Sequence, residues 1–279
     1  MKNFIANTKR IVRRLTGAYR QPLKIEFVVA EHCNLNCKGC THYSPLAPSD
    51  MPSLESVEGD MSRIAKVCGS ELAKVGLVGG ETLLYPLLPE AMRLLAKYFP
   101  DAERVIYTNG LMLPRMDAAF WAAVRESAVV IELTRYPVKF DYDAVIRLCE
   151  SKGVKVRVYG DRGRHGTFFK FGLDPTGKQD ASLSHFRCFN RGCLTVTEGK
   201  LFGCATSAFI GRLNAVSQEQ FNLTEKDYIS LDGLTDVKQV KRFINHAVPF
   251  CRYCVTPHKV VPYGPSRRDP SEWIEEASQ

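Results

Sequence analysis

The sequence predicts an α/β protein whose parallel sheet forms a partial barrel, followed by a small cysteine-rich appendage. From residue 23 onward, short apolar runs rich in β-branched residues alternate with longer helical patterns, as in repeated β-α units. This alternation ends near residue 160, where Gly, Asp, Lys and Ser become frequent. Five of the ten cysteines follow that point. We therefore expect three segments, at residues 1–20, 21–165 and 166–279.

The barrel segment should contain five strands and four helices. The strands are expected at 24–30, 74–78, 103–107, 128–133 and 154–159, and the helices at 54–68, 87–98, 116–126 and 141–152. Asp117 and Asp141 stand near two helix starts, and Gly153 stands just after a helix end. In the appendage we expect a hairpin over 194–202 and a helix over 237–246.

Residues 1–20 predict a basic amphipathic helix. Its apolar face is Phe4, Ile5, Ile11, Val12 and Leu15, and its opposite face is Lys9, Arg10, Arg13 and Arg14. The helix either attaches to an anionic membrane surface or packs on the barrel with a solvated basic face. We prefer the second interpretation because the helix is short.

Composition narrows the class of protein. Hydrophobic residues make up 45% and charged residues 24%, which is ordinary for a globular protein. No apolar run is long enough to span a bilayer and no secretory signal is recognisable, so we expect a cytoplasmic protein whose thiols stay reduced. The net charge of +8 comes without a nucleic-acid-binding signature, which argues against that partner. Metal or redox chemistry best explains so many cysteines.

Three cysteines lie close together directly after the first expected strand, as Cys33-x3-Cys37-x2-Cys40. A structural zinc site needs four ligands, and His32 or His42 would have to complete it. Three thiolates also hold three corners of a 4Fe-4S cluster and leave the fourth iron open.

This spacing, on the loop after the first barrel strand, resembles the motif of the radical S-adenosylmethionine superfamily. The resemblance implies a partial (β/α)6 TIM-like barrel. It also implies that the open iron binds S-adenosylmethionine, which is cleaved reductively to a 5'-deoxyadenosyl radical that abstracts hydrogen from a substrate. The residue before the third cysteine is usually aromatic in that family, but here it is Gly39. Tyr43 is our candidate for the missing contact with the cofactor.

Three further motifs at the ends of expected strands resemble the same family. Gly79-Gly80-Glu81 resembles the glycine-glycine-glutamate motif that receives the methionyl ammonium, and glycines permit a close backbone approach. The resemblance also implies cofactor contacts from Asn109, after the third strand, and from Glu132, Thr134 and Arg135, at the end of the fourth. Each motif alone would also fit an ordinary turn or an exposed strand end.

The second cysteine group is Cys188, Cys193, Cys204, Cys251 and Cys254, and it resembles the short twitch form of a SPASM domain. The resemblance implies one auxiliary iron-sulfur cluster, for which we expect Cys188, Cys204, Cys251 and Cys254 as ligands. Cys193 would then be a packing residue or a catalytic thiol that donates a hydrogen atom. Structural zinc on any four of the five is the alternative. Cys68 and Cys149 lie in helical patterns and are expected to be buried.

Three functions remain open. The first is dehydrogenation or epimerisation of a small polar substrate such as a sugar or cyclitol, with an electron donor such as flavodoxin or ferredoxin. The second is peptide or protein maturation by the same superfamily, which often places a peptide-binding domain ahead of the barrel; only about 20 residues precede the first strand here. The third is a non-catalytic metal-binding module. Several basic residues lie near the segment junction, namely Arg162, Arg164, His165, Arg187 and Arg191. They indicate either an anionic group on the substrate or merely a solvated basic loop.

Overall fold

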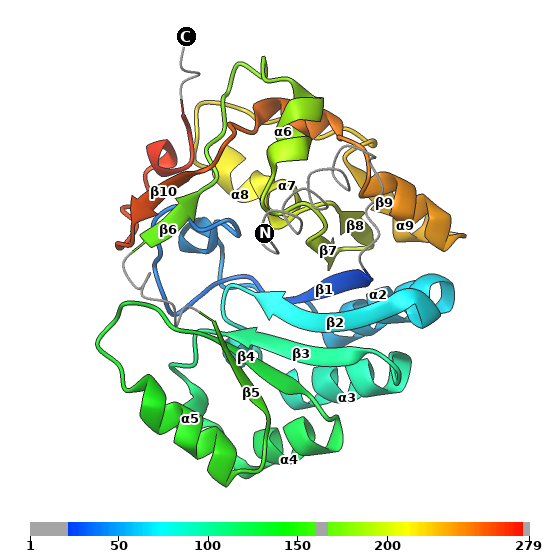
Figure 1. Cartoon of the computed structure of the whole chain (residues 1–279), viewed down its shortest axis with the longest axis vertical. Helices are drawn as coiled ribbons and strands as arrows, with labels where there is room; N and C mark the ends of the chain where they lie inside the picture. The colour runs from blue at the N-terminus through cyan, green and yellow to red at the C-terminus, as the bar shows by residue number, and fades with distance from the viewer. Residues whose placement is uncertain (1–21, 160–166, 276–279) are drawn as a thin grey trace, which may run out of the picture.

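Six parallel strands form the centre of the molecule. A computed structural model describes residues 22–159 and 167–275, so the expected leader helix, Arg162, Arg164 and His165 lie outside the described residues. The sheet has the order β5-β4-β3-β2-β1-β7-β8-β9 (Figure 1). The strands are β1 (Leu23–Ala30), β2 (Leu72–Gly79), β3 (Glu103–Thr108), β4 (Val130–Thr134), β5 (Val156–Tyr159), β7 (Leu194–Thr197), β8 (Lys200–Phe202) and β9 (Tyr228–Ser230). Neighbours from β5 to β7 are parallel, whereas β8 and β9 are antiparallel. The predicted α/β class and barrel-like parallel sheet are confirmed.

Four helices cover one face of the sheet, and Figure 1 shows α3, α4 and α5 in the lower part of the molecule and α2 beside β1 and β2. They are α2 (Leu54–Cys68), α3 (Leu88–Tyr98), α4 (Ala118–Glu126) and α5 (Tyr142–Ser151). Asp117 and Asp141 cap α4 and α5 by accepting from backbone amides. Gly153 follows α5 with a φ of 66°, a conformation that favours glycine. The predicted helices and their capping residues are confirmed.

Successive side chains of β1 face opposite sides of the sheet, one side packed with helices and the other lined by a cavity. Ile25, Phe27 and Val29 pack in the core shared with the four helices. Val28 belongs to a second core, and the side chain of Glu26 lines a cavity on the same side of the sheet. The face opposite the helices is therefore the face that carries the site.

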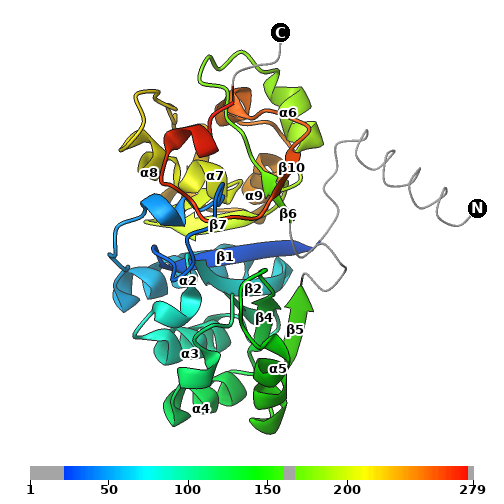
Figure 2. The same cartoon turned by 90° about the vertical axis from the view of Figure 1, so that its left-hand side faces the viewer.

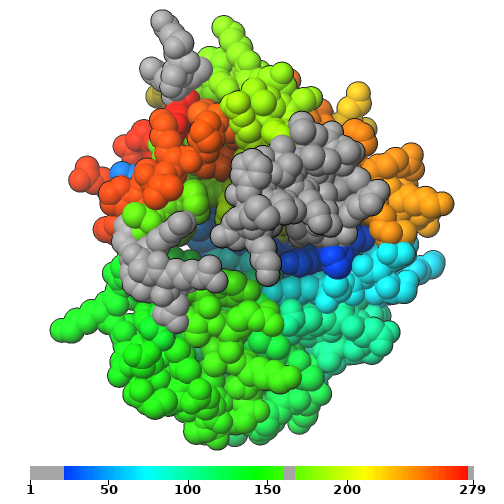
Figure 3. Space-filling model, viewed as in Figure 1, coloured from blue at the N-terminus to red at the C-terminus, as the bar shows by residue number. Residues whose placement is uncertain are grey.

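The C-terminal elements pack on that opposite face, as Figure 2 shows above β1. They are the helices α6 (Ala181–Arg187), α7 (Ala205–Ala208), α8 (Ile210–Asn214) and α9 (Val237–Phe243), with a two-stranded sheet of β6 (Thr167–Lys170) and β10 (Lys259–Pro262). The predicted hairpin is β7 and β8, and the predicted helix is α9. In the space-filling view of Figure 3 these elements form the upper half of the molecule.

The sheet continues across the expected segment boundary at residue 165. Ile25 and Phe27 of β1 pair with Leu194 and Val196 of β7, so the sixth parallel strand comes from the segment that we expected to be an appendage. The division into segments stays a prediction. None of the helices within residues 22–159 and 167–275 has the length and apolar character required to cross a membrane.

Candidate functional site

The cysteine loop follows β1 and is covered by a C-terminal segment at residues 263–273. Cys37 forms an isolated antiparallel bridge with Pro265, and the amide of Lys38 donates to the carbonyl of Gly264 at 2.9 Å. The thiol of Cys37 lies 3.7 Å from the hydroxyl of Tyr263. The C-terminal segment therefore holds the loop that carries the three cysteines.

A cavity of about 250 Å³ opens at the carboxyl ends of the parallel strands. Ligand sites of open α/β sheets and barrels lie at this end. The cavity brings together eight of the residues predicted from the sequence: Cys33, Cys37, Cys40, Gly79, Gly80, Glu81, Asn109 and Thr134.

The two glycines allow the end of β2 to touch the start of the cysteine loop. A Cβ on Gly79 would lie 2.1 Å from the carbonyl oxygen of Ala30, and one on Gly80 would lie 2.2 Å from that of His32. The amide of Gly80 donates to Ala30 at 2.9 Å, and the amide of Glu81 donates to His32 at 3.1 Å. The glycine pair thus positions the loop as well as lining the cavity.

Glu81 is buried and holds the end of β3. Its Oε1 accepts from the hydroxyl of Thr108 at 2.6 Å and from the amide of Leu83 at 3.0 Å, and its Oε2 accepts from the amide of Asn109 at 2.8 Å. Burial raises the pKa of the carboxyl, although these three donors oppose the rise. A cation entering the cavity would meet a carboxylate that is already fixed in place.

Asn109 connects the third strand to the first cysteine. Its Nδ2 donates to Asn34 Oδ1 at 2.7 Å and lies 3.7 Å from the sulfur of Cys33. Its Oδ1 accepts from the amide of Leu111 at 3.0 Å. Side-chain donors near thiolate sulfurs tune and orient metal ligands, so Asn109 is placed to act on Cys33.

Three predicted residues do not line this cavity. The ring of Tyr43 is fully buried and packs against Trp273, with ring centroids 5.7 Å apart. Glu132 forms ion pairs with Lys74 and Arg157 in the sheet. The guanidinium of Arg135 pairs with Asp143 at 2.6 Å.

The cavity also contains residues that the sequence analysis did not select. Glu26 lines it beside Tyr107, whose hydroxyl donates to the Glu26 carboxyl. Burial raises the pKa of Glu26 to about 7. His42 also lines the cavity, and its Nδ1 lies 2.8 Å from the carbonyl oxygen of Gly79. The available signal for Glu26 was an acidic residue between Ile25 and Phe27 in a strand.

The chemistry of the three thiols fits a metal cluster. Burial raises the pKa of Cys33 to about 12 and that of Cys37 to about 11. A bound metal stabilises thiolates against such burial, because its positive charge replaces the lost hydration. The imidazole of His42 meets Gly79, which argues against its Nδ1 completing a zinc site.

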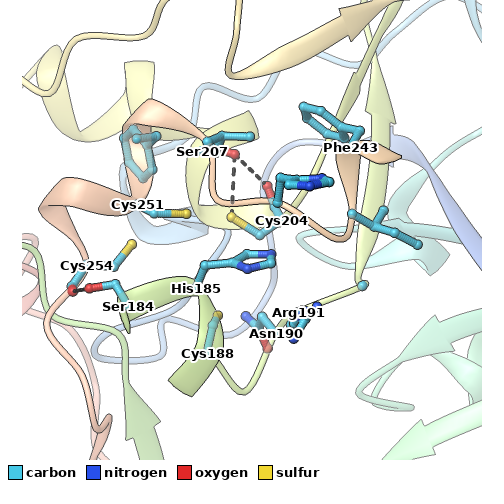
Figure 4. A pocket seen from close by; sticks show the side chains of 16 residues that line it. Ser184, His185, Cys188, Asn190, Arg191, Cys204, Ser207, Phe243, Cys251 and Cys254 are labelled. Carbon is cyan, nitrogen blue, oxygen red and sulfur yellow. Dashed lines mark hydrogen bonds between the residues drawn. The ribbon is translucent and has the colours of Figure 1, made fainter. Parts of the chain in front are cut away.

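The second cysteine group surrounds another, smaller cavity of about 50 Å³. Figure 4 shows Cys188, Cys204, Cys251 and Cys254 around this cavity, with the ring of His185 between them. These are the four ligands that the sequence analysis selected, and Cys193 does not line the cavity. Within the part of the chain that the structure describes, no three His, Cys, Asp or Glu side chains form a single-ion site. Arg191 also lines this second cavity.

The remaining cysteines are placed as follows. Cys68 and Cys149 are fully buried in the helical core, as predicted. Cys193 is exposed to solvent, although the atoms packed around its thiol raise the pKa of that thiol to about 12 by desolvation. Among ionisable groups Glu26 raises this pKa most, followed by Cys204 and Cys188, and Cys193 lines neither cavity.

The fold and the site together define a parallel α/β barrel protein with a three-thiol loop at the carboxyl ends of its strands. No protein-family model matches the chain. The chain is 37% identical over 92 residues to GTP 3',8-cyclase of Chlorobaculum tepidum, which is 33% of this chain and 27% of that protein. It is 32% identical over 136 residues to GTP 3',8-cyclase 1 of Mycobacterium tuberculosis, which is 46% of this chain and 35% of that protein.

Among solved structures, the fold is similar to that of BtrN in complex with AdoMet and 2-DOIA. The TM-score is 0.54 at 17% sequence identity, and the match covers 85% of this chain and 94% of BtrN. The chain spans about a third or less of the length of the two cyclases. The sequence is thus similar in part to GTP 3',8-cyclases, and the fold is similar to that of BtrN.

Proposed function

We propose that this protein is a radical S-adenosylmethionine enzyme that binds a 4Fe-4S cluster through Cys33, Cys37 and Cys40. The observation that carries the proposal is that these three thiols share one cavity with Gly80 and Glu81 at the carboxyl ends of the strands. When bound, the cluster and S-adenosylmethionine supply a 5'-deoxyadenosyl radical. The residues of the chain bind, orient and enclose these groups.

The end of β2 and the loop after β3 form the cofactor side of the cavity. Glu81 presents a carboxylate to the methionyl ammonium, because Thr108 and the amide of Asn109 hold it from behind. Thr134 at the end of β4 also lines the cavity, where its hydroxyl is available to the ribose. Asn109 stays close to Cys33 and keeps the cysteine loop in register with the strand ends.

The four C-terminal cysteines hold one auxiliary iron-sulfur cluster in this proposal. Their placement around one cavity supports the predicted ligand set, whereas Cys193 lies outside it. Closed four-thiolate coordination would also suit zinc, so metal analysis of the purified protein decides between the two.

The substrate side of the cavity favours a small polar molecule with hydroxyl or amino groups. Its charged lining is Glu26 and Glu81, and no Lys or Arg is among the described residues that line it. Glu26, with a pKa of about 7, is suited to accept a proton from a substrate hydroxyl during dehydrogenation or epimerisation. Cys193, influenced by Glu26, is the candidate hydrogen-atom donor for epimerisation. A flavodoxin or ferredoxin is the proposed electron donor.

Anaerobic reconstitution with iron and sulfide, followed by a strong reductant, tests the proposal. We expect release of 5'-deoxyadenosine from S-adenosylmethionine, and consumption of a hydroxyl-bearing substrate in a screen of sugars and cyclitols. A reconstituted protein that holds iron at the first loop but never cleaves S-adenosylmethionine would contradict the proposed function.

A further inference from the structure

Tyr43 belongs by sequence to the first cysteine loop but by structure to the second core. Its amide donates to the carbonyl of Cys40 at 3.0 Å, and its φ of 50° is a conformation that residues with a Cβ rarely adopt. The ring packs in the core that contains Phe209, Phe250 and Tyr253, and Cys254 packs against that core. The backbone thus turns the Tyr43 side chain away from the first cavity and into the core against which Cys254 packs.

The hydroxyl of Tyr43 is a buried donor with no hydrogen-bond partner among the described residues. The side chain is 0% exposed, so the hydroxyl is not in contact with bulk solvent. The ionisable groups that act on it most strongly are the thiols of Cys254 and Cys204, ahead of Cys40. A buried hydroxyl without a partner destabilises a folded protein, and such groups in native proteins have an explanation in function or in a bound group.

We propose that the Tyr43 hydroxyl donates a hydrogen bond to a sulfur of the cluster held by Cys204 and Cys254, so Tyr43 is a positioning residue of the auxiliary site. This inference rests on the proposed function, because it needs iron and sulfur at the second cysteine group. Tyr43 then connects the two sites, since it lies three residues after Cys40 and belongs to the core against which Cys254 packs.

Hydrogen bonds to cluster sulfurs stabilise the reduced, more negative state and raise the reduction potential. Removing the Tyr43 hydroxyl should therefore make the potential of the auxiliary cluster more negative. In the metal-free protein, removing the hydroxyl should leave the folding stability unchanged or raise it, because the hydroxyl has no hydrogen-bond partner there. If Tyr43 only packed in the core, its replacement by Phe would not shift the potential of the cluster.

The test uses Tyr43→Phe in the full chain, in a Cys33→Ala, Cys37→Ala, Cys40→Ala background in which only the C-terminal cysteines hold iron. Tyr253→Phe is the matched control. Tyr253 is also buried in this core and precedes Cys254, but its hydroxyl already accepts from Arg252 at 2.6 Å. A redox titration monitored by electron paramagnetic resonance gives the reduction potential of the auxiliary cluster. A proton hyperfine coupling that disappears in D2O shows an exchangeable proton near the cluster.

For Tyr43→Phe we expect unchanged iron content, a more negative potential, loss of the exchangeable-proton signal, and a metal-free melting temperature no lower than that of the parent. Tyr253→Phe should leave potential and proton signal unchanged. An unaltered potential in Tyr43→Phe with full iron would overturn the inference while the proposed cluster stands. Zinc instead of iron in the parent would overturn the auxiliary cluster, and the inference with it.

Discussion

The indole Nε1 of Trp273 donates to the backbone carbonyl of Cys40 at 2.8 Å, across 233 residues of sequence. Trp273 is buried, and its carbonyl accepts from the amide of Leu173 at 2.8 Å. Leu173 in turn bridges to Cys254. The loop of the first cysteine group and the ligands of the second are therefore connected through the C-terminal segment.

Alanine at Cys33, Cys37 and Cys40 together should abolish release of 5'-deoxyadenosine. The three thiols are the only predicted ligands of the first cluster, and a site without them has nothing to bind iron. Chromatography of the reaction products and iron analysis check this. Cys149→Ala is the control, because that thiol is buried in the helical core. Cleavage that persists in the triple variant would remove the central claim.

Glu81→Gln should weaken binding of S-adenosylmethionine and leave iron at the first loop unchanged. The amide would also turn a donor toward Thr108 or the amides of Leu83 and Asn109, which costs about 1–3 kcal/mol of folding stability. Equilibrium binding to the reconstituted protein and urea unfolding measure the two effects. Loss of the first cluster itself would show that the role of Glu81 is structural alone.

Gly80→Ala should prevent the cysteine loop from forming correctly. Its Cβ would lie 2.2 Å from the carbonyl oxygen of His32 and 2.8 Å from the amide nitrogen of Cys33, and both atoms are backbone. We expect destabilisation of roughly 3 kcal/mol or more, measured by urea unfolding, together with reduced iron at the first site. Gly69→Ala is the control, because nothing lies within 4 Å of its added Cβ. Equal iron content in both variants would contradict this explanation.

Cys188→Ala and Cys193→Ala separate the two candidates for the fourth auxiliary ligand. Cys188 lines the second cavity with the other three thiols and Cys193 does not, so iron and the auxiliary signal should fall only in Cys188→Ala. If epimerisation is the reaction, Cys193→Ala should keep S-adenosylmethionine cleavage but lose solvent hydrogen incorporation into the product. The reverse pattern of iron loss would show that the ligand assignment is wrong.

Glu26→Gln should change how stability depends on pH. The pKa of Glu26 is raised from 4.5 to about 7, first by burial, with Tyr107 and Lys74 opposing the rise and Glu132 adding to it. The folded protein therefore keeps a proton that the unfolded chain releases above pH 4.5. The contribution of Glu26 to the free energy of unfolding of the wild-type protein should therefore fall as pH rises from 4.5 to 7. Above pH 7 this contribution should stay constant.

The glutamine variant lacks this titration, so above pH 7 it should exceed the wild-type protein by up to about 3 kcal/mol of unfolding free energy. Urea unfolding of both proteins from about pH 5 to pH 8 measures the difference. Parallel stability curves would show that Glu26 titrates normally.

The sequence by itself determined the local features: the first five strands, the four helices that cover the sheet, their caps, and the ligand candidates of both cysteine groups. Hydrophobic periodicity, capping residues and cysteine spacing are local patterns, so they can be recognised without knowledge of the rest of the fold. Cys188 is among the residues around the second cavity and Cys193 is not, and the choice between them as ligands stays a prediction.

Only the tertiary structure decided which distant residues meet. It placed β7 beside β1, set Glu132 in ion pairs with Lys74 and Arg157, and made Glu26 part of the cavity. It also turned Tyr43 away from the first cavity and laid Trp273 over the cysteine loop. Such contacts depend on how the chain packs around its cores, and packing between residues far apart in sequence has no local period to reveal it.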